Sequence, residues 1–261
     1  MWWQLRDAWR RRQDQAALVR KAIPDVLWRR TLKRFPFLPR AGQPEEAALR
    51  RLCSLFLDRK EFTGAHGLVV TDDMAVAIAA QACLPCLGLP LGLAAYDGFV
   101  GIVVHPGQAK VRREHMDESG IVHEYDEILA GEAVHGGPVM LSWRDVRASG
   151  ASADFGYNVV IHEFAHVLDM ADGLADGTPV LPPAIPRDAW QHTLRTEFDG
   201  FCSRVDAGVS TALDPYGAES IDEFFAVASE SFFVSPLAMR DEHAGLYALF
   251  VRYYGADPAG P

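Results

Sequence analysis

Residues 162–166 read His-Glu-Phe-Ala-His and lie within the apolar stretch 159–169. The apolar residues of this stretch recur at helical spacing, so the sequence predicts a buried α-helix there. On a helix, positions i and i+4 share one face, and the imidazoles of His162 and His166 can therefore converge on one cation. Glu163 would flank that face, where it could take a proton from a water held by the ion. The alternative is an amphipathic core helix that carries two polar histidines and binds no metal.

Two histidines leave a catalytic zinc ion short of the three protein ligands that it usually has. One known spacing, His-Glu-x-x-His-x-x-Gly-x-x-His, is that of the metzincins. In this chain Asp169 stands at the glycine position and Asp172 at the last position. Because the glycine allows the chain to turn sharply there, its absence makes Asp172 only a second choice for the third ligand.

A downstream segment offers a better candidate. The residues from Ser220 to Glu230 predict a helix on which Glu223 and Glu230, seven residues apart, share a face. Glu223 adjoins the apolar residues 224–227, which predicts partial burial, and a buried carboxylate favours a nearby cation. The rival role is structural, since Ser220-x-x-Glu223 matches a capping box. From these residues alone, both roles of Glu223 remain open.

The order of the motifs resembles a known family. Tyr216 stands seven residues before Glu223, which begins Glu-Phe-Phe-Ala, and both follow His-Glu-x-x-His. This order is similar to that of the Mlc titration factor A family of bacterial zinc peptidases and, over this part only, to the catalytic domain of anthrax lethal factor. Further motifs of the first family precede His162 in the expected order, namely Cys83-Leu-Pro, Tyr96-Asp-Gly-Phe99, Gly137-Pro-Val-Met-Leu-Ser-Trp143 and Gly156-Tyr-Asn158. The resemblance spans residues 65–255.

The resemblance implies a site and an activity. One Zn²⁺ per chain would be held by His162, His166 and Glu223, with Glu163 as general base and Tyr216 as a catalytic hydroxyl. The implied fold is α+β and of the zincin metallopeptidase type, with a small mixed sheet packed on the active-site helix and an N-terminal helical segment. The implied function is an aminopeptidase-like action on peptide or protein substrates, together with binding of an Mlc-type transcriptional repressor. The alternative is a regulatory repressor-binding protein whose zinc site is mainly structural.

Charge is distributed unevenly along the chain. Residues 1–60 carry a net charge of +9 and residues 61–261 a net charge of −19, within a total of −10. We expect a basic N-terminal helical region over 1–60 and a zinc metallopeptidase domain over 61–261. The basic segment most simply packs against the acidic remainder or is solvated. It shows no spacing of a nucleic-acid-binding motif, so direct nucleic-acid binding is not expected.

Breaker residues and apolar runs predict the main elements. The first sixty residues should form two or three short helices, broken at Pro24, at 35–39 and at Gly42. Another helix should begin near Thr71 or Asp72 and end near Cys83, and a further one should span 188–204. Strands are expected at 67–71, 99–105 and 138–143, and a hairpin or surface excursion at 112–137. We expect 137–143 to be an edge strand that aligns an extended peptide by backbone pairing.

The sequence also bears on cellular location. The N-terminus lacks the apolar run of a signal peptide. Residues 74–96 carry no charge, but Pro85 and Pro90 would interrupt a helix crossing a membrane. The four cysteines include Cys83 and Cys86 in an apolar context without a second such pair, which predicts buried free thiols. A cytoplasmic protein without a membrane segment is therefore expected.

Overall fold

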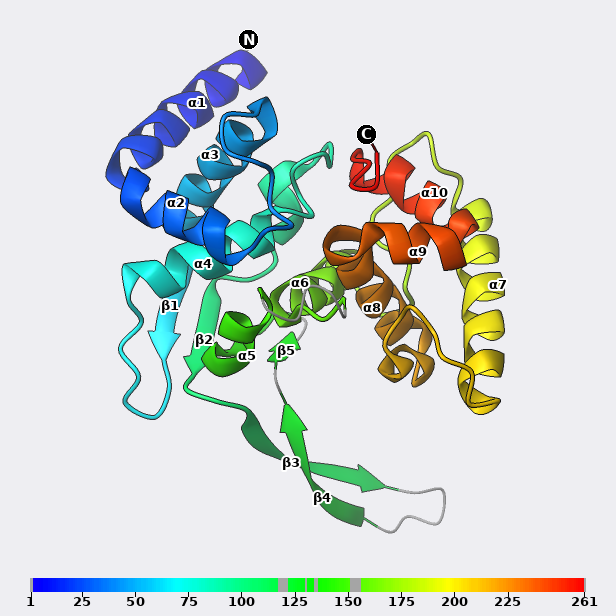
Figure 1. Ribbon diagram of the computed structural model, residues 1–261. Coiled ribbons are helices and arrows are strands. Elements are labelled where there is room, and N and C mark those ends of the chain that lie inside the picture. Colours follow the sequence, from blue (N-terminus) through cyan, green and yellow to red (C-terminus); the bar gives the residue numbers. More distant parts are fainter. Residues whose placement is uncertain (1, 117–121, 130, 134–135, 151–155, 261) are drawn as a thin grey trace.

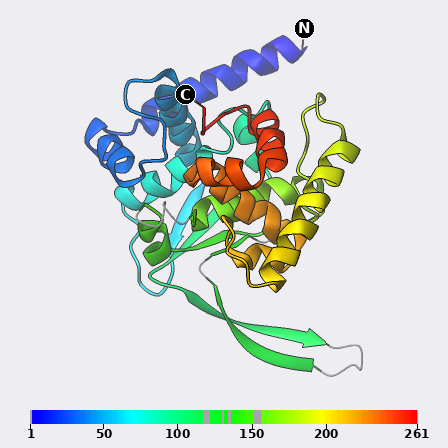
Figure 2. The same ribbon diagram turned by 45° about the vertical axis from the view of Figure 1, so that its right-hand side comes forward.

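The computed structural model describes residues 2–116, 122–129, 131–133, 136–150 and 156–260, and its architecture is α+β, as predicted. The basic segment forms three helices that gather on one side of the molecule, as Figures 1 and 2 show. They are α1 (Trp2–Arg20), α2 (Asp25–Arg34) and α3 (Pro44–Arg59). Pro24 precedes α2 and Pro44 opens α3, positions where a missing backbone N–H costs nothing. The predicted division of this segment into short helices is confirmed.

Arginines of the basic segment form ion pairs both within it and with the next helix, α4 (Asp72–Cys83). Arg20 lies 2.9 Å from Asp58, and Arg34 lies 3.1 Å from Asp73 at the start of α4. Such surface pairs contribute at most about 1 kcal/mol each. Packing connects the basic segment to the rest of the chain more strongly, because one cluster of buried apolar side chains includes residues from Ala17 to Tyr254. The division of the chain into two regions at residue 60 stays a prediction.

The sheet is small and mixed, with the strand order β1-β2-β6-β5. The strands β1 (Glu61–Gly64), β2 (Gly101–His105) and β6 (Val139–Ser142) are parallel, and β5 (Gly131–Ala133) is antiparallel to β6. The sequence prediction that 137–143 is an edge strand is wrong, because β6 pairs on both sides. After a long excursion the chain returns through β5, which pairs with β6 and takes the edge position.

A second expectation, the strand at 67–71, is also wrong. His66 has φ 53° and Gly67 has φ 78°, and the Leu68 N–H donates to the Ala65 carbonyl at 3.0 Å. These left-handed residues form a tight turn, so the chain leaves the sheet before the apolar run begins. The predicted strands over 99–105 and 138–143 correspond to β2 and β6. The predicted cap of α4 is confirmed, because the Thr71 hydroxyl accepts from the Met74 N–H at 3.3 Å.

A long hairpin connects β2 to β5. Its strands β3 (Ala109–Met116) and β4 (Val122–Leu129) pair antiparallel, which confirms the excursion expected within 112–137. The hairpin projects away from the body of the molecule in both views (Figures 1 and 2). Because β5 follows β4 almost directly, the base of the hairpin lies beside the free edge of the sheet.

Helix α6 (Val159–Asp169) carries the His-Glu-x-x-His motif and packs against β5, β6 and α8 (Ile221–Val234). Its N-cap is Asn158, whose side-chain oxygen accepts from the Ile161 N–H at 2.9 Å. On its buried face Phe164 meets a cluster of aromatic rings, namely Phe56, Tyr96 and Phe99. Burying a phenylalanine side chain contributes about 2–3 kcal/mol. This cluster therefore fixes which face of α6 turns away from the core.

The C-terminal helices cover the other side of α8. They are α7 (Arg187–Asp206), which matches the predicted helix, α9 (Pro236–Glu242) and α10 (Ala244–Tyr254). Trp190 of α7 stacks on Phe250 of α10 with ring centroids 5.7 Å apart. In the part of the chain that the structure describes, no helix is both long and apolar enough to cross a bilayer. The four cysteines are free thiols, as predicted, and three of them are buried.

Candidate metal centre

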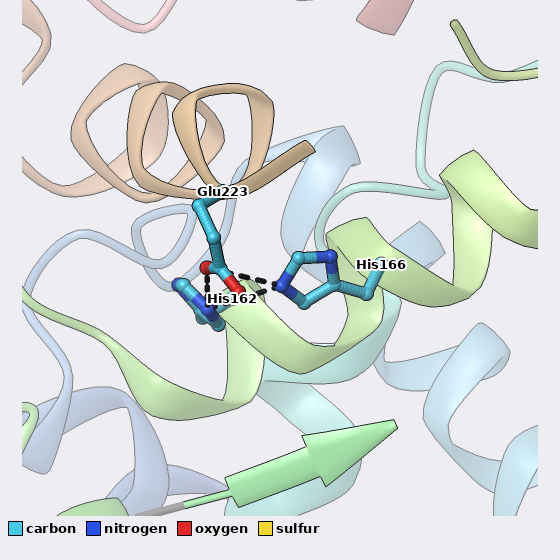
Figure 3. Close-up of side chains that lie close together, drawn as sticks. All are labelled: His162, His166 and Glu223. Atoms are coloured by element: carbon cyan, nitrogen blue, oxygen red, sulfur yellow. Dashed lines mark hydrogen bonds and ion pairs between the residues drawn. The ribbon is translucent and has the colours of Figure 1, made fainter. Parts of the chain in front are cut away.

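Three predicted ligands converge between two helices. His162 and His166 project from α6, and Glu223 projects from the first turn of α8 toward them (Figure 3). The Oε2 atom of Glu223 lies 3.1 Å from His162 Nε2 and 3.4 Å from His166 Nε2. The two Nε2 atoms are 3.2 Å apart. Among the described residues, these form the one group of His, Cys, Asp or Glu side chains that could together hold an ion.

The spacing of these atoms fits a tetrahedral cation. Ligand atoms bonded to zinc at about 2.0–2.1 Å lie about 3.3 Å from one another in that geometry. The Oε2 atom of Glu223 is also buried, and among the described residues it accepts no hydrogen bond, although two imidazole nitrogens lie within 3.4 Å of it. Burial would raise the pKa of Glu223, but the imidazoles beside it hold that pKa below its ordinary value. An anionic oxygen thus faces two nitrogens across a space that suits a metal ion.

Glu230 orients the first histidine. Its Oε1 atom lies 2.7 Å from His162 Nδ1, and its Oε2 atom accepts from the Asn158 backbone N–H. When Nδ1–H donates to this carboxylate, the lone pair of Nε2 is left to face the cluster. Burial raises the pKa of Glu230, and its contacts with His162 and Asn158 oppose this effect. Sequence reasoning placed Glu230 on the face of Glu223 without giving it this role, although the seven-residue spacing was the available signal.

Glu163 lies beside the cluster and is only 4% exposed. Burial raises the pKa of its carboxyl group to about 7. The edge strand β5 comes very close to this side chain, since a Cβ atom on Gly131 would stand 2.4 Å from Glu163 Oε1. Only glycine lets the backbone approach a neighbouring group so closely. The sequence analysis missed Gly131, because the motif does not show which strand covers it.

Tyr216 and Ser220 lie on the segment that leads into α8. Tyr216 belongs to the short helix η4 (Pro215–Ala218), and its ring centroid is 6.1 Å from that of His162. Tyr216 is 41% exposed, so this residue lies at the surface beside His162. The Ser220 hydroxyl accepts from the Glu223 N–H at 3.4 Å, which is half of the predicted capping box. The carboxylate of Glu223 meanwhile faces the histidines, so the cap uses the backbone N–H and leaves the carboxylate available to a cation.

The second-choice ligand is occupied elsewhere. Asp172 lies in η3 (Met170–Asp172), where it accepts from Arg187 at 3.2 Å and from the Leu174 N–H at 3.2 Å. It does not belong to the cluster that could hold an ion. Asp169, at the metzincin glycine position, accepts from the Gly177 N–H at 3.0 Å and is likewise outside this cluster.

Comparisons with known proteins show the family to which the chain belongs. The chain is 34% identical to a Synechocystis protein described as uncharacterized, over 96% of this chain and 89% of that protein. It is 32% identical to Mlc titration factor A of Yersinia pestis and of Yersinia pseudotuberculosis, with 96% of this chain and 89% of each relative covered. The family match spans residues 6–255, so it includes the basic segment, which lay outside the 65–255 covered by the motifs. The chain belongs to the glucose-regulated metallo-peptidase M90 family.

Proposed function

We propose that this protein is a cytoplasmic zinc-dependent peptidase of the zincin type, with one Zn²⁺ held by His162, His166 and Glu223. The observation that carries this proposal is the convergence of three ligand atoms within 3.1–3.4 Å of one another. Two neutral imidazoles and one carboxylate leave a zinc ion with net positive charge and an open coordination position. Family membership and the buried Glu163 beside the cluster support the same function.

The chain's own groups can carry out peptide hydrolysis. A bound zinc ion would supply Lewis-acid chemistry, which lowers the pKa of water toward about 7 and polarises a carbonyl. Glu163 accepts the proton of the attacking water and passes it to the leaving amine. The Tyr216 hydroxyl donates a hydrogen bond to the developing oxyanion, which stabilises the transition state by about 3–4 kcal/mol.

The edge of the sheet can align a substrate. Among the described strands none pairs with the outer side of β5, and this strand lies directly against Glu163. An extended peptide that adds to this edge by backbone hydrogen bonds would pass the proposed base. The aligning strand is therefore β5, in place of the segment 137–143 expected from the sequence.

Metal removal tests the proposed function. We expect purified protein to contain about one zinc per chain, and a chelator should abolish hydrolysis of a peptide library. Added Zn²⁺ should restore it, and peptides with a free N-terminus should be cleaved faster than N-blocked ones if aminopeptidase-like action dominates. Atomic absorption and mass spectrometry of the products provide the two measurements. Hydrolysis that continues in zinc-free protein would refute the proposal.

The names of the Yersinia relatives favour a second function. They are called Mlc titration factor A, which describes titration of Mlc by those proteins. We propose that this chain also binds an Mlc-type transcriptional repressor, with the zinc site mainly structural if hydrolysis is absent. Co-purification with an Mlc homologue of the host organism tests this binding. No complex at micromolar concentrations of both proteins would argue against it.

Replacing Glu230 should weaken metal binding through His162. Glu230→Ala removes the group 2.7 Å from Nδ1 and should lower zinc affinity by about 10–100-fold, as loss of such a supporting partner typically does. Glu230→Gln keeps an acceptor for Nδ1–H and should retain most of the affinity. Competition with a fluorescent zinc chelator measures both constants. Equal losses of zinc affinity in the two variants would indicate that the hydrogen bond to His162 does not support metal binding.

A further inference from the structure

An apolar cavity of about 340 Å³ opens at the C-terminal end of α6, the helix that carries the two candidate histidine ligands. Four segments form its walls: residues 91–99, which include η1 (Gly92–Tyr96), the start of β6 with the two glycines before it, the C-terminal end of α6 with the start of η3, and Val180 in the loop before α7. Apolar side chains on these walls include Leu91, Ala95, Phe99, Val139, Val167 and Met170. Its size lies within the range of small-ligand pockets, which begins at about 300 Å³.

The cavity lies on the same side of α6 as the proposed base. Val167 follows His166 directly, and it stands four residues after Glu163 on one flank of the helix. In the edge strand, Gly131 is packed on Glu163, and Ala133 pairs with Val139, which belongs to the cavity wall. A peptide that pairs with β5 would therefore pass from Glu163 to the mouth of the cavity.

The lining favours an uncharged occupant. Of the described residues that form it, Asp97 alone carries a charge. Leu91 and Val180 at the rim are 52% and 45% exposed, although apolar side chains of this size are usually buried. Both also line an adjoining apolar cavity of about 170 Å³. A concave and mostly apolar surface is the usual form of a small-ligand site.

A lysine beneath the cavity holds one wall in place. The Nζ atom of Lys60 donates to the carbonyls of Tyr96, at 2.6 Å, and of Phe99, and it lies 3.8 Å from the centre of the Phe99 ring. Phe99 and the residues between these two carbonyls form part of the wall. These contacts of Lys60 fix the turn, so this wall of the cavity is already in place in the protein without a ligand.

We propose that this cavity accepts a bulky apolar side chain of the peptide substrate, of the size of leucine or phenylalanine. The protein then selects peptides that carry such a residue close to the bond that is cleaved. This inference rests on the proposed peptidase function, because the occupant is a part of that substrate. It adds a specificity-determining surface that includes Ala95 and Val180 and lies apart from the proposed zinc ligands.

Binding to an inactive variant tests the cavity apart from hydrolysis. The zinc-loaded Glu163→Gln protein is titrated with fluorescein-labelled peptide libraries that differ only in Leu, Phe or Gly at one position. Adding Ala95→Trp should fill the cavity and weaken binding of the Leu and Phe libraries at least tenfold, while the Gly library changes less than twofold. Ala47→Trp, on the exposed side of α3, is the matched control and should change none of them.

A second variant distinguishes a filled cavity from a misfolded protein. Val180→Asp changes an exposed rim residue, so the fold should persist, and it should weaken binding of the Leu and Phe libraries in the same assay. Undiminished binding in both variants would overturn the proposal.

Hydrolysis provides a separate measurement. In protein with Glu163 intact, kcat/KM should be at least tenfold higher for the Leu library than for the Gly library. Equal values would show that the protein is a peptidase whose selectivity does not depend on this cavity. Selective binding without any hydrolysis would instead overturn the peptidase function and keep the pocket.

Discussion

Replacing Glu163 by Gln should lower kcat/KM for peptide hydrolysis by about 10²–10⁴-fold while the zinc content stays near one per chain. The amide keeps the size of the carboxyl group but cannot accept a proton from water. The carboxylate of Glu163 lies outside the three-residue cluster that could hold the ion, so the metal should remain bound. Steady-state kinetics on the peptide library, together with zinc analysis of the same sample, measures both quantities.

Two comparisons make this result specific. Glu45→Gln changes an exposed glutamate in the first turn of α3 and should leave hydrolysis unaltered. Hydrolysis by Glu163→Gln at the original rate would refute the role of Glu163 as base. An Mlc-type repressor that still binds the inactive variant would show that repressor binding is a function separate from catalysis.

Local parts of the site could be predicted from the sequence because helix geometry fixes them. The i, i+4 spacing places His162 and His166 on one face of α6 whatever surrounds the helix. The contact with Glu223 has a different origin, since it depends on how α8 packs across α6. The residues alone left capping and ligation equally open for Glu223, and only the family resemblance favoured ligation. The structure shows that capping uses the Glu223 backbone and leaves its carboxylate to face the histidines.

What the sequence missed depends on pairing between distant segments. The edge strand β5 is three residues long, which is too short to show an alternating pattern. It lies at the edge because one side of β6 pairs with β2 and the other side pairs with β5. The close contact of Gly131 with Glu163 follows from that pairing. The apolar run at 67–71 looked like a strand, yet the left-handed backbone at His66 and Gly67 turns the chain out of the sheet. A one-dimensional pattern records apolar character and does not record such turns.

Replacing Glu223 by Ala should release zinc on dialysis. Loss of partners that merely support a ligand already costs about 10–100-fold in metal affinity, so loss of a ligand itself should cost more than about 100-fold. The cap of α8 should survive this change, because Ser220 accepts from the backbone N–H of residue 223, which alanine retains. Zinc loss with an unchanged thermal unfolding profile of the metal-free protein would therefore assign the effect to the missing carboxylate.

Asp172→Ala is the matched control for this prediction. Asp172 is the other acidic candidate for the third ligand, but its side chain pairs with the exposed Arg187. Breaking that surface pair should cost at most about 1 kcal/mol of stability and leave the zinc content unchanged. Zinc retained by Glu223→Ala and lost from Asp172→Ala would move the third ligand to the segment after α6. Because Glu223 projects from α8, zinc loss confined to Glu223→Ala would also show that the packing of α8 on α6 completes the metal site.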